Sequence, residues 1–269
     1  DDKSYKIICG YEDDRIVVIQ NKHNVGLTSN LNLGLKLAKG KYIARMDADD
    51  ISLYNRLELQ INFLEKHPEF ELVGSSAILI NETGNKIGEI SRSFDHQNIL
   101  GNIFFFNPII HPSILFKKSF FEAVGNYDEE ILKAQDYELW FRMVAHSGKA
   151  FVLSEPLIEH REHSESIESK YSLIQEENVV LILKKWLANL LDYDVDVLSI
   201  TCFRKAWQNG RIDSYSKIFP LIIFLMKLNL KFGYRFSNKP KAIIRVSINS
   251  LRLIARVLLR FYKDRISYA

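Results

Sequence analysis

Three carboxylates fall within four residues of this chain, at Asp47, Asp49 and Asp50, directly after an apolar run that ends at Met46. Carboxylates this close together repel one another unless a cation offsets their charge. Mg²⁺ and Mn²⁺ bind one or two carboxylates together with the phosphate oxygens of a substrate, so the cluster is a candidate site for a metal-bound nucleoside diphosphate. Asp is also favoured at helix N-caps, and an acidic capping loop is the alternative interpretation.

A second candidate is Asp136, which follows Gln135 and opens an apolar, aromatic stretch that includes Trp140. If the Asp136 side chain faces a partly dry pocket, desolvation would raise its pKa toward the range that suits a general base, whereas a helix N-terminus would oppose that rise. An Asp at this position can also be a helix cap and nothing more. Both interpretations stay open from these residues alone.

A third group is the polar stretch that contains Arg161 and His163, just after Pro156. Arg binds phosphate through its two-pronged guanidinium, and His can donate to a diphosphate oxygen or ligate a metal. A solvated linker is the alternative interpretation. His111, in His111-Pro112-Ser113, could line a pocket or stand in a plain turn.

An alternation of strands and helices is predicted to position these side chains. The apolar patterns predict strands over residues 15–20, 42–46, 71–80, 113–116 and 150–153 and helices over 28–39, 55–66, 96–105 and 136–146. Such alternation is typical of parallel βαβ units, in which ligands collect at the carboxyl ends of the strands. The acidic cluster stands at such an end, after the strand 42–46. From residue 169 onward the pattern is helical throughout.

Charge is distributed very unevenly along the 269 residues. Residues 203–269 contain 15 Lys and Arg against 2 Asp and Glu, a net charge of +13, which leaves the first 202 residues at −10. So basic a segment is drawn to anionic lipid or nucleic acid, while the acidic remainder repels nucleic acid, so we expect lipid and no nucleic acid as the partner. No secretory signal and no apolar run of the roughly 20 residues that a spanning helix needs is present.

The basic segment also contains an amphipathic pattern. Apolar residues repeat at helical spacing with cationic residues beside them: Ile244, Ile248, Leu251, Ala255, Leu258 and Tyr262, flanked by Arg245, Arg252, Arg256 and Lys263. Such a helix could pack on the acidic part of the chain, or it could lie in the plane of an anionic membrane, where lipid-linked acceptors reside.

Taken in order, the motifs of residues 1–169 resemble those of family 2 of the inverting glycosyltransferases. No single motif decides this; the resemblance rests on the ordered series Asp1-Asp2-Lys3-Ser4, Asn24-Val25-Gly26-Leu27, Gly40-Lys41-Tyr42-Ile43, Asp47-Ala48-Asp49-Asp50, Arg56, His111-Pro112-Ser113, Gly125-Asn126-Tyr127-Asp128, Gln135-Asp136-Tyr137-Glu138-Leu139-Trp140 and Arg161-Glu162-His163. It implies an α/β fold of the A type, a Rossmann-like mixed sheet flanked by helices, over residues 1–168. Residues 169–269 would then be a basic, α-helical C-terminal extension.

On the donor side, the resemblance implies a nucleoside diphosphate sugar, most often a UDP-sugar. Asp49 would ligate Mn²⁺ or Mg²⁺ on the diphosphate, and Asp47 would contact the ribose, the sugar or the metal. Asp2 would contact the nucleobase, and Arg161 with His163 would hold the departing diphosphate.

On the acceptor side, the resemblance implies that Asp136 removes the proton from a hydroxyl of a glycan or lipid-linked acceptor, with inversion at the anomeric carbon. Gln135, Trp140 and His111 would lie near that acceptor. Gln135 replaces a residue that is frequently acidic in the family.

The resemblance further implies a bacterial enzyme of surface polysaccharide synthesis, cytoplasmic and peripheral to the inner face of the cell membrane. Family members have a strand, a helix and a second strand before the Asp-Asp motif, so we expect this chain to be N-terminally incomplete. Two alternatives remain: a non-catalytic binding or scaffold relative, and a metal-dependent nucleotidyl or phosphoryl transferase.

Overall fold

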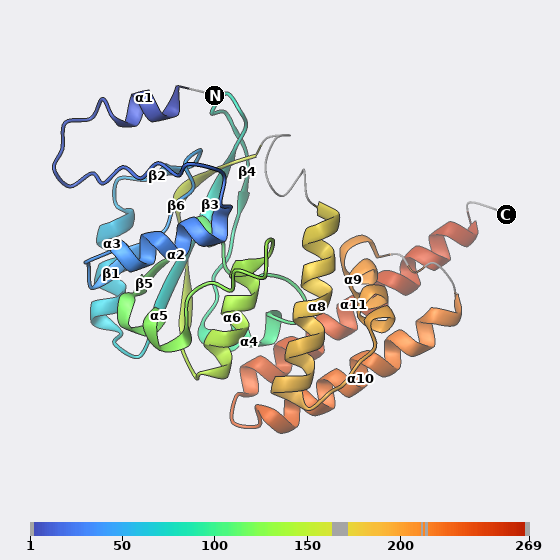
Figure 1. Ribbon diagram of the computed structural model, residues 1–269. Helices are drawn as coiled ribbons and strands as arrows, with labels where there is room; N and C mark the ends of the chain where they lie inside the picture. The colour runs from blue at the N-terminus through green and yellow to red at the C-terminus, as the bar shows by residue number, and fades with distance from the viewer. Residues whose placement is uncertain (1–2, 163–171, 211, 213–214, 267–269) are drawn as a thin grey trace.

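The computed structural model of the protein describes residues 3–162, 172–210, 212 and 215–266. Within these residues six strands form one mixed sheet, which helices flank, and a group of long helices stands beside it (Figure 1). The strands run in the order β1-β5-β3-β6-β2, and β4 pairs with β3. Their bounds are Tyr42–Ala44 (β1), Ile51–Ser52 (β2), Leu72–Ile80 (β3), Lys86–Ile90 (β4), Leu115–Lys117 (β5) and Ala150–Arg161 (β6).

The helices divide into those that cover the sheet and those of the extension. Around the sheet lie α1 (Ser4–Ile8), α2 (Leu27–Leu37), α3 (Arg56–Lys66), α4 (His96–Asn102), α5 (Lys118–Val124), α6 (Gln135–Ala145) and the short 3₁₀ turn η1 (His111–Ser113). The extension consists of α8 (Ser172–Leu191), α9 (Val197–Asn209), η2 (Tyr215–Lys217), α10 (Ile218–Arg235) and α11 (Pro240–Ile266). Among the described helices none combines the length and apolarity that crossing a bilayer requires.

The sheet is mixed rather than built of parallel βαβ units. Only β3 and β6 pair in parallel among the described strands, and every other pair is antiparallel. The expectation of parallel units was wrong here because β4 follows β3 through the tight turn 81–85 and pairs back on it. The strand predicted over residues 150–153 continues to Arg161, passing Pro156 at a register shift opposite Ser76, where a Pro is tolerated.

One predicted strand does not form. Residues 15–20 have no strand pairing, and their apolar side chains are exposed, with Val17 at 76% of its full accessibility. A strand needs a neighbour to satisfy its backbone groups and cover its apolar face. β1 pairs with β5 on one side, and on its other side it pairs with no described segment. Residues 15–20 therefore have no described strand beside them.

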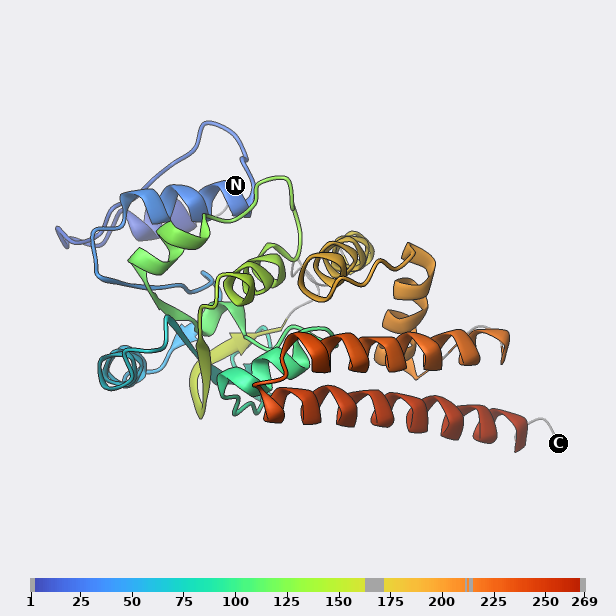
Figure 2. The ribbon, with the colours of Figure 1, turned by 90° about the horizontal axis from the view of Figure 1, so that it is seen from below.

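The extension packs directly against the region around the sheet. α11 lies along α4, where Arg245 donates to Asn98 Oδ1 (3.0 Å) and Asn249 donates to Asn102 Oδ1 (2.9 Å). Arg204, in α9, donates to the carbonyl oxygen of Phe105 (2.9 Å). One apolar core continues from Leu72 in the sheet through α6 to the extension. Figure 2 shows α10 and α11 side by side as an antiparallel hairpin.

Candidate functional site

The acidic loop begins where β1 ends, and its first carboxylate is held by an arginine. Asp47 is half-buried and forms a two-pronged ion pair with Arg45, with nitrogen–oxygen distances of 2.7 and 2.5 Å. The pKa of Asp47 is raised, chiefly because burial disfavours its charged form, although Arg45 opposes the shift. The charges of Asp50 and Asp49 raise that pKa further. Both neighbouring carboxylates thus act on Asp47 in the direction that repulsion requires.

Asp50 and Arg161 join the acidic loop to the end of β6. The buried Asp50 accepts a hydrogen bond from the backbone N–H of Arg161 (2.9 Å) and lies 3.0 Å from His160 Nδ1. The Arg161 guanidinium donates to the carbonyl oxygens of Asp49 (2.8 Å), Asn81 (2.8 Å) and Glu82 (3.1 Å). Arg161 thus lies beside the acidic loop and holds its backbone to the end of β6 and to the turn 81–82.

A buried arginine fixes the base of the loop. Arg56, at the start of α3, is 1% exposed, and its Nη2 donates to the carbonyl oxygens of Arg45 (2.7 Å) and Ile114 (3.1 Å). Its Nε donates to Gln60 Oε1 (3.1 Å). Burial lowers the pKa of Arg56 to about 10, with a smaller contribution from Arg45 in the same direction. At neutral pH it stays charged and joins β1, β5 and α3 behind the carboxylates.

Asp136 stands in the first turn of α6 and is half-buried. Its Oδ2 accepts a short hydrogen bond from Asn107 Nδ2 (2.6 Å). Two residues earlier, Ala134 adopts a left-handed conformation (φ 62°), which is unfavourable for a residue with a Cβ and is typical of functional sites. The chain thus enters α6 through a strained turn, and the Asn107 side chain holds the Asp136 carboxylate that follows it.

Tyr127 forms a buried polar pair with His111. Its hydroxyl lies 2.7 Å from His111 Nε2, and both residues are buried. Burial raises the pKa of Tyr127, Arg45 opposes this, and the charges of Asp136 and Asp47 both raise it further. Burial also holds the pKa of His111 well below its usual range, so His111 is neutral at pH 7.

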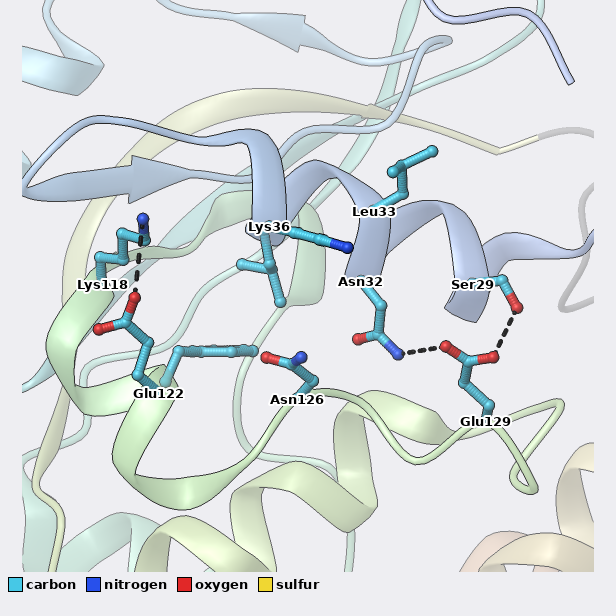
Figure 3. A pocket seen from close by; sticks show the side chains of 10 residues that line it. Ser29, Asn32, Leu33, Lys36, Lys118, Glu122, Asn126 and Glu129 are labelled. Atoms are coloured by element: carbon cyan, nitrogen blue, oxygen red, sulfur yellow. Dashed lines mark hydrogen bonds and ion pairs between the residues drawn. The ribbon is translucent and has the colours of Figure 1, made fainter.

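The turn that presents Tyr127 is braced by α2. Asn32 donates to the carbonyl oxygen of Tyr127 (3.0 Å) and accepts from its N–H (3.0 Å). Below this contact lies a cavity of about 530 Å³ between α2 and the α5 region, and Figure 3 shows two groups of paired side chains in its lining, Glu129 with Ser29 and Asn32, and Lys118 with Glu122. Glu129 accepts from both Ser29 (3.0 Å) and Asn32 (2.8 Å). The lining of this cavity includes none of the predicted catalytic or binding residues.

Two residues near Asp136 were missed by sequence reasoning. Asn107 is its hydrogen-bond donor, and Arg92 lies close enough for the charge of Asp136 to raise its pKa. Burial is the larger effect on Arg92 and lowers that pKa to about 10, so the side chain remains cationic at neutral pH. No local pattern marks Arg92, which follows β4; the Asn107-Pro108 pair reads only as a turn.

The remaining predicted residues differ in what the structure says of them. Gln135 is 7% exposed, and Trp140 is fully buried, with its ring 6.1 Å from that of His111. Trp140 and His111 can therefore shape the site from behind, but they present almost no surface to an acceptor. Asp2 and His163 lie outside the described residues.

The donor atoms at the acidic loop suit a hard divalent cation. Within the described part of the chain, no group of three or more His, Cys, Asp and Glu side chains is arranged to hold a metal by itself. Mg²⁺ and Mn²⁺ at substrate sites need only one or two carboxylates when phosphate oxygens complete the shell. Asp49 is exposed beside Asp47, whose pKa is raised chiefly by burial and further by the charges of Asp50 and Asp49, so a cation bound here would meet excess negative charge.

Comparison with known proteins shows that the chain is similar in sequence to glycosyltransferases. Residues 1–124 match the family model described as Glycosyl transferase family 2. An uncharacterized glycosyltransferase of Methanocaldococcus jannaschii, MJ1057, is 34% identical over 162 residues, which cover 59% of this chain and 56% of the relative. The amylovoran biosynthesis glycosyltransferase AmsE of Erwinia amylovora is 32% identical over 158 residues, 58% of each chain. The chain thus spans little more than half the length of these relatives.

Solved structures show the same fold. The crystal structure of S. aureus TarS, residues 1–349, aligns with a TM-score of 0.53 and 14% identity over 95% of this chain and 76% of that one. TarS 1–349 has also been solved in complex with UDP, and that structure aligns with a TM-score of 0.52. At this identity the likeness concerns the fold alone, and it confirms the predicted mixed sheet flanked by helices and followed by C-terminal helices.

Proposed function

Because this chain belongs to glycosyl transferase family 2 and has the A-type glycosyltransferase fold, we propose that it transfers a sugar from a nucleoside diphosphate sugar to an acceptor hydroxyl with inversion. The observation that supports this most is the contact between the acidic loop and the end of β6, where the Arg161 guanidinium donates to the carbonyl oxygen of Asp49 (2.8 Å). A cation is thus held beside the carboxylates of the loop, and a departing diphosphate needs such a charge.

On the donor side, the acidic loop and the end of β6 hold the nucleoside diphosphate. Asp49 would hold a Mn²⁺ or Mg²⁺ ion, which when bound neutralises charge on the diphosphate leaving group. Asp47, fixed by Arg45, is oriented toward the ribose or the transferred sugar. The Arg161 guanidinium lies against the backbone of Asp49 and adds a fixed positive charge beside the phosphates. The UDP complex of TarS supports a uridine nucleotide as the donor.

On the acceptor side, Asp136 removes the proton of the attacking hydroxyl. Its place in the first turn of α6 favours the carboxylate form, and the hydrogen bond from Asn107 holds the side chain in one orientation. The oxygen of the acceptor forms a bond to the anomeric carbon as the bond from that carbon to the diphosphate breaks. The proton passes to Asp136, and attack from the side opposite the leaving group inverts the configuration.

The biological setting is the synthesis of a polysaccharide or another cell-surface glycan. AmsE, one of the similar proteins, is described as an amylovoran biosynthesis glycosyltransferase, which supports this class of product. We place the protein at the cytoplasmic face of a membrane, where glycan or lipid-linked acceptors are within reach. The net charge of +13 over residues 203–269 supports the membrane as a partner.

Donor turnover tests this function. Purified protein would be incubated with a set of nucleotide sugars and with Mn²⁺ or Mg²⁺, and the anomeric configuration of the product would be read by NMR. We expect turnover of a UDP-sugar that requires the metal and gives an inverted linkage. A retained linkage would contradict the mechanism, and transfer of a nucleotidyl or phosphoryl group would contradict the proposed reaction class.

A further inference from the structure

The α10–α11 hairpin has two rows of exposed apolar side chains, and the row on α10 was not foreseen from the sequence. On α10 the exposed residues are Phe219, Ile223, Met226, Leu230 and Tyr234, and on α11 they are Ile244, Ile248, Leu251, Leu258 and Leu259. Several are strongly exposed: Phe219 at 70%, Leu230 at 72% and Leu251 at 67%. At about 1.5 Å per residue the row on α10 is about 22 Å long.

Each row lies on the side of its helix that is opposite the core. On α10 the buried residues include Leu221, Leu228 and Phe232, and at about 100° per residue the exposed row is half a turn away from them. On α11 the buried residues include Val246 and Leu253, and the exposed row is again half a turn away. Neither row is therefore needed for the packing of the extension.

The two rows face the same side of the hairpin. α10 and α11 meet through Asn229, which donates to Ser250 Oγ (2.7 Å) and accepts from Ser247 Oγ (2.9 Å). Each helix can be viewed along its own axis, from its N-terminus to its C-terminus. In both views the buried face, this polar contact and the exposed row follow one another in the same rotational order. Because the helices are antiparallel (Figure 2), that shared order brings both rows to one outward face.

Cationic residues border this outward face. Lys227 on α10 and Arg252 on α11 are exposed, and each lies on the side of its row that is turned away from the other helix. Among the described side chains of α10 and α11 there is no Asp or Glu. The side chains of Tyr262 and Lys263, which the sequence pattern assigned to the same face, lie outside the described ones.

We propose that this outward face of the α10–α11 hairpin binds the surface of an anionic lipid bilayer. The apolar rows would enter the boundary between headgroups and acyl chains, and the bordering Lys and Arg would meet lipid phosphates, an arrangement suited to helices that lie in a membrane plane. A second copy of this chain is a poor occupant, because it would bring another segment of net charge +13 against the first. The proposal rests on, and deepens, the membrane-associated sugar transfer proposed above.

Vesicle sedimentation tests the surface. The probe is a set of vesicles made of equal parts phosphatidylglycerol and phosphatidylcholine, with pure phosphatidylcholine vesicles beside them. We expect the protein to sediment with the anionic vesicles at least about tenfold more strongly than with the neutral ones, and less strongly at high salt. No sedimentation with anionic vesicles would overturn the proposal, as would equal binding to both kinds.

Matched variants locate the contact. Leu251→Glu and Leu230→Glu place a charge within the apolar rows, and each should weaken binding to anionic vesicles about tenfold or more. The control is Leu198→Glu on α9, where the native side chain is 68% exposed, against 67% for Leu251; this variant should bind vesicles like the unchanged protein. Equal losses in all three variants would overturn the assignment, and so would a dimer in sedimentation equilibrium that Leu251→Glu dissociates.

A separate readout keeps the two proposals distinguishable. UDP binding by calorimetry with Mn²⁺ should be unchanged in the variants Leu230→Glu and Leu251→Glu, because neither residue belongs to the donor site. A protein that binds vesicles but not UDP would contradict the proposed sugar transfer and leave the membrane surface standing. A protein that binds UDP but not vesicles would overturn the surface alone.

Discussion

Gly101 lies where α4 and α11 come closest, and it offers a direct test of how the extension docks. A Cβ added at Gly101 would lie 2.5 Å from Arg245 Cβ and 2.7 Å from the carbonyl oxygen of Ala242. Contacts below 3.0 Å essentially never occur for a real Cβ, and the oxygen belongs to the α11 backbone, so it moves only with that helix. Gly101→Ala must therefore push α11 away from α4.

The cost follows from three effects. Overpacking typically destabilises by about 1–3 kcal/mol, and loss of the neighbouring hydrogen bond from Asn249 to Asn102 adds about 1 kcal/mol. The higher helix propensity of Ala offsets about 1 kcal/mol of this. We therefore expect Gly101→Ala to lower the free energy of unfolding by about 1–3 kcal/mol.

Gly233→Ala is the matched control. Gly233 lies within α10 and would bring its new Cβ within 4 Å of no heavy atom, so only the gain in helix propensity remains, about 1 kcal/mol of stabilisation. Thermal unfolding should separate the two, because 1 kcal/mol corresponds to about 2–4 °C in a chain of this size. If both variants shift the melting temperature in the same direction, the close approach of α4 and α11 is refuted.

Three further predictions concern single side chains. Glu138 is fully buried and ion-paired with Arg142 (2.6 Å), so Glu138→Gln should lower stability in urea denaturation by about 3–5 kcal/mol, and a loss below 1 kcal/mol would contradict a buried pair. Burial lowers the pKa of His96 to about 4, so below pH 6.5 the unfolded chain binds a proton that the folded chain does not bind. The free energy of unfolding should therefore fall by about 2 kcal/mol between pH 7.5 and pH 5. Denaturation curves at the two pH values should show that this part of the pH dependence is missing from His96→Gln. Asn107→Leu removes the hydrogen bond to the Asp136 carboxylate, so turnover should fall about tenfold and the acidic limb of the pH profile of turnover should move to higher pH. The affinity for UDP should stay unchanged. A pH profile that does not move would contradict the positioning role of Asn107.

The elements around the site could be predicted because their patterns are local. The helix predicted over residues 136–146 is observed as α6 (Gln135–Ala145), and the strand predicted over 71–80 is observed as β3 (Leu72–Ile80). Their apolar spacing reflects the face that each element buries, which a short window of sequence contains. The segment 15–20 has an equally apolar pattern, but strand formation depends on a neighbour that the pattern cannot supply.

The candidate site could be predicted in its charged residues but not in their partners. The sequence marked Asp47, Asp49 and Arg161, and the structure brings them to one edge of the sheet. From the sequence alone, neither the pairing of Arg45 with Asp47 nor that of Asn107 with Asp136, 29 residues away, could be predicted. The pair of Asn107 with Asp136 joins segments far apart in sequence, and no local pattern marks Asn107 as the partner. Arg45 is only two residues from Asp47, but its side chain pairs with that carboxylate in a backbone conformation that the sequence does not specify.

The same limit explains the exposed face of the extension. The basic helix at residues 244–258 was visible because apolar and cationic residues alternate at helical spacing. α10 is apolar on nearly all sides, so its sequence does not tell which residues face the core and which face outward. Only the packing against α8, α9 and α11 separates Leu228, fully buried, from Leu230, which is 72% exposed.

In the proposed reaction the acidic loop holds the donor, while Asp136 at the start of α6 removes the proton of the acceptor hydroxyl. This division of roles is tested most directly by measuring UDP affinity and turnover together in Asp49→Asn and Asp136→Asn, with the exposed Asp194→Asn as the control. We expect Asp49→Asn to lose metal-dependent UDP binding, and Asp136→Asn to bind UDP normally while turnover falls about 10²–10⁴-fold. Full turnover by Asp136→Asn, or unchanged UDP binding and turnover in Asp49→Asn, would contradict the account.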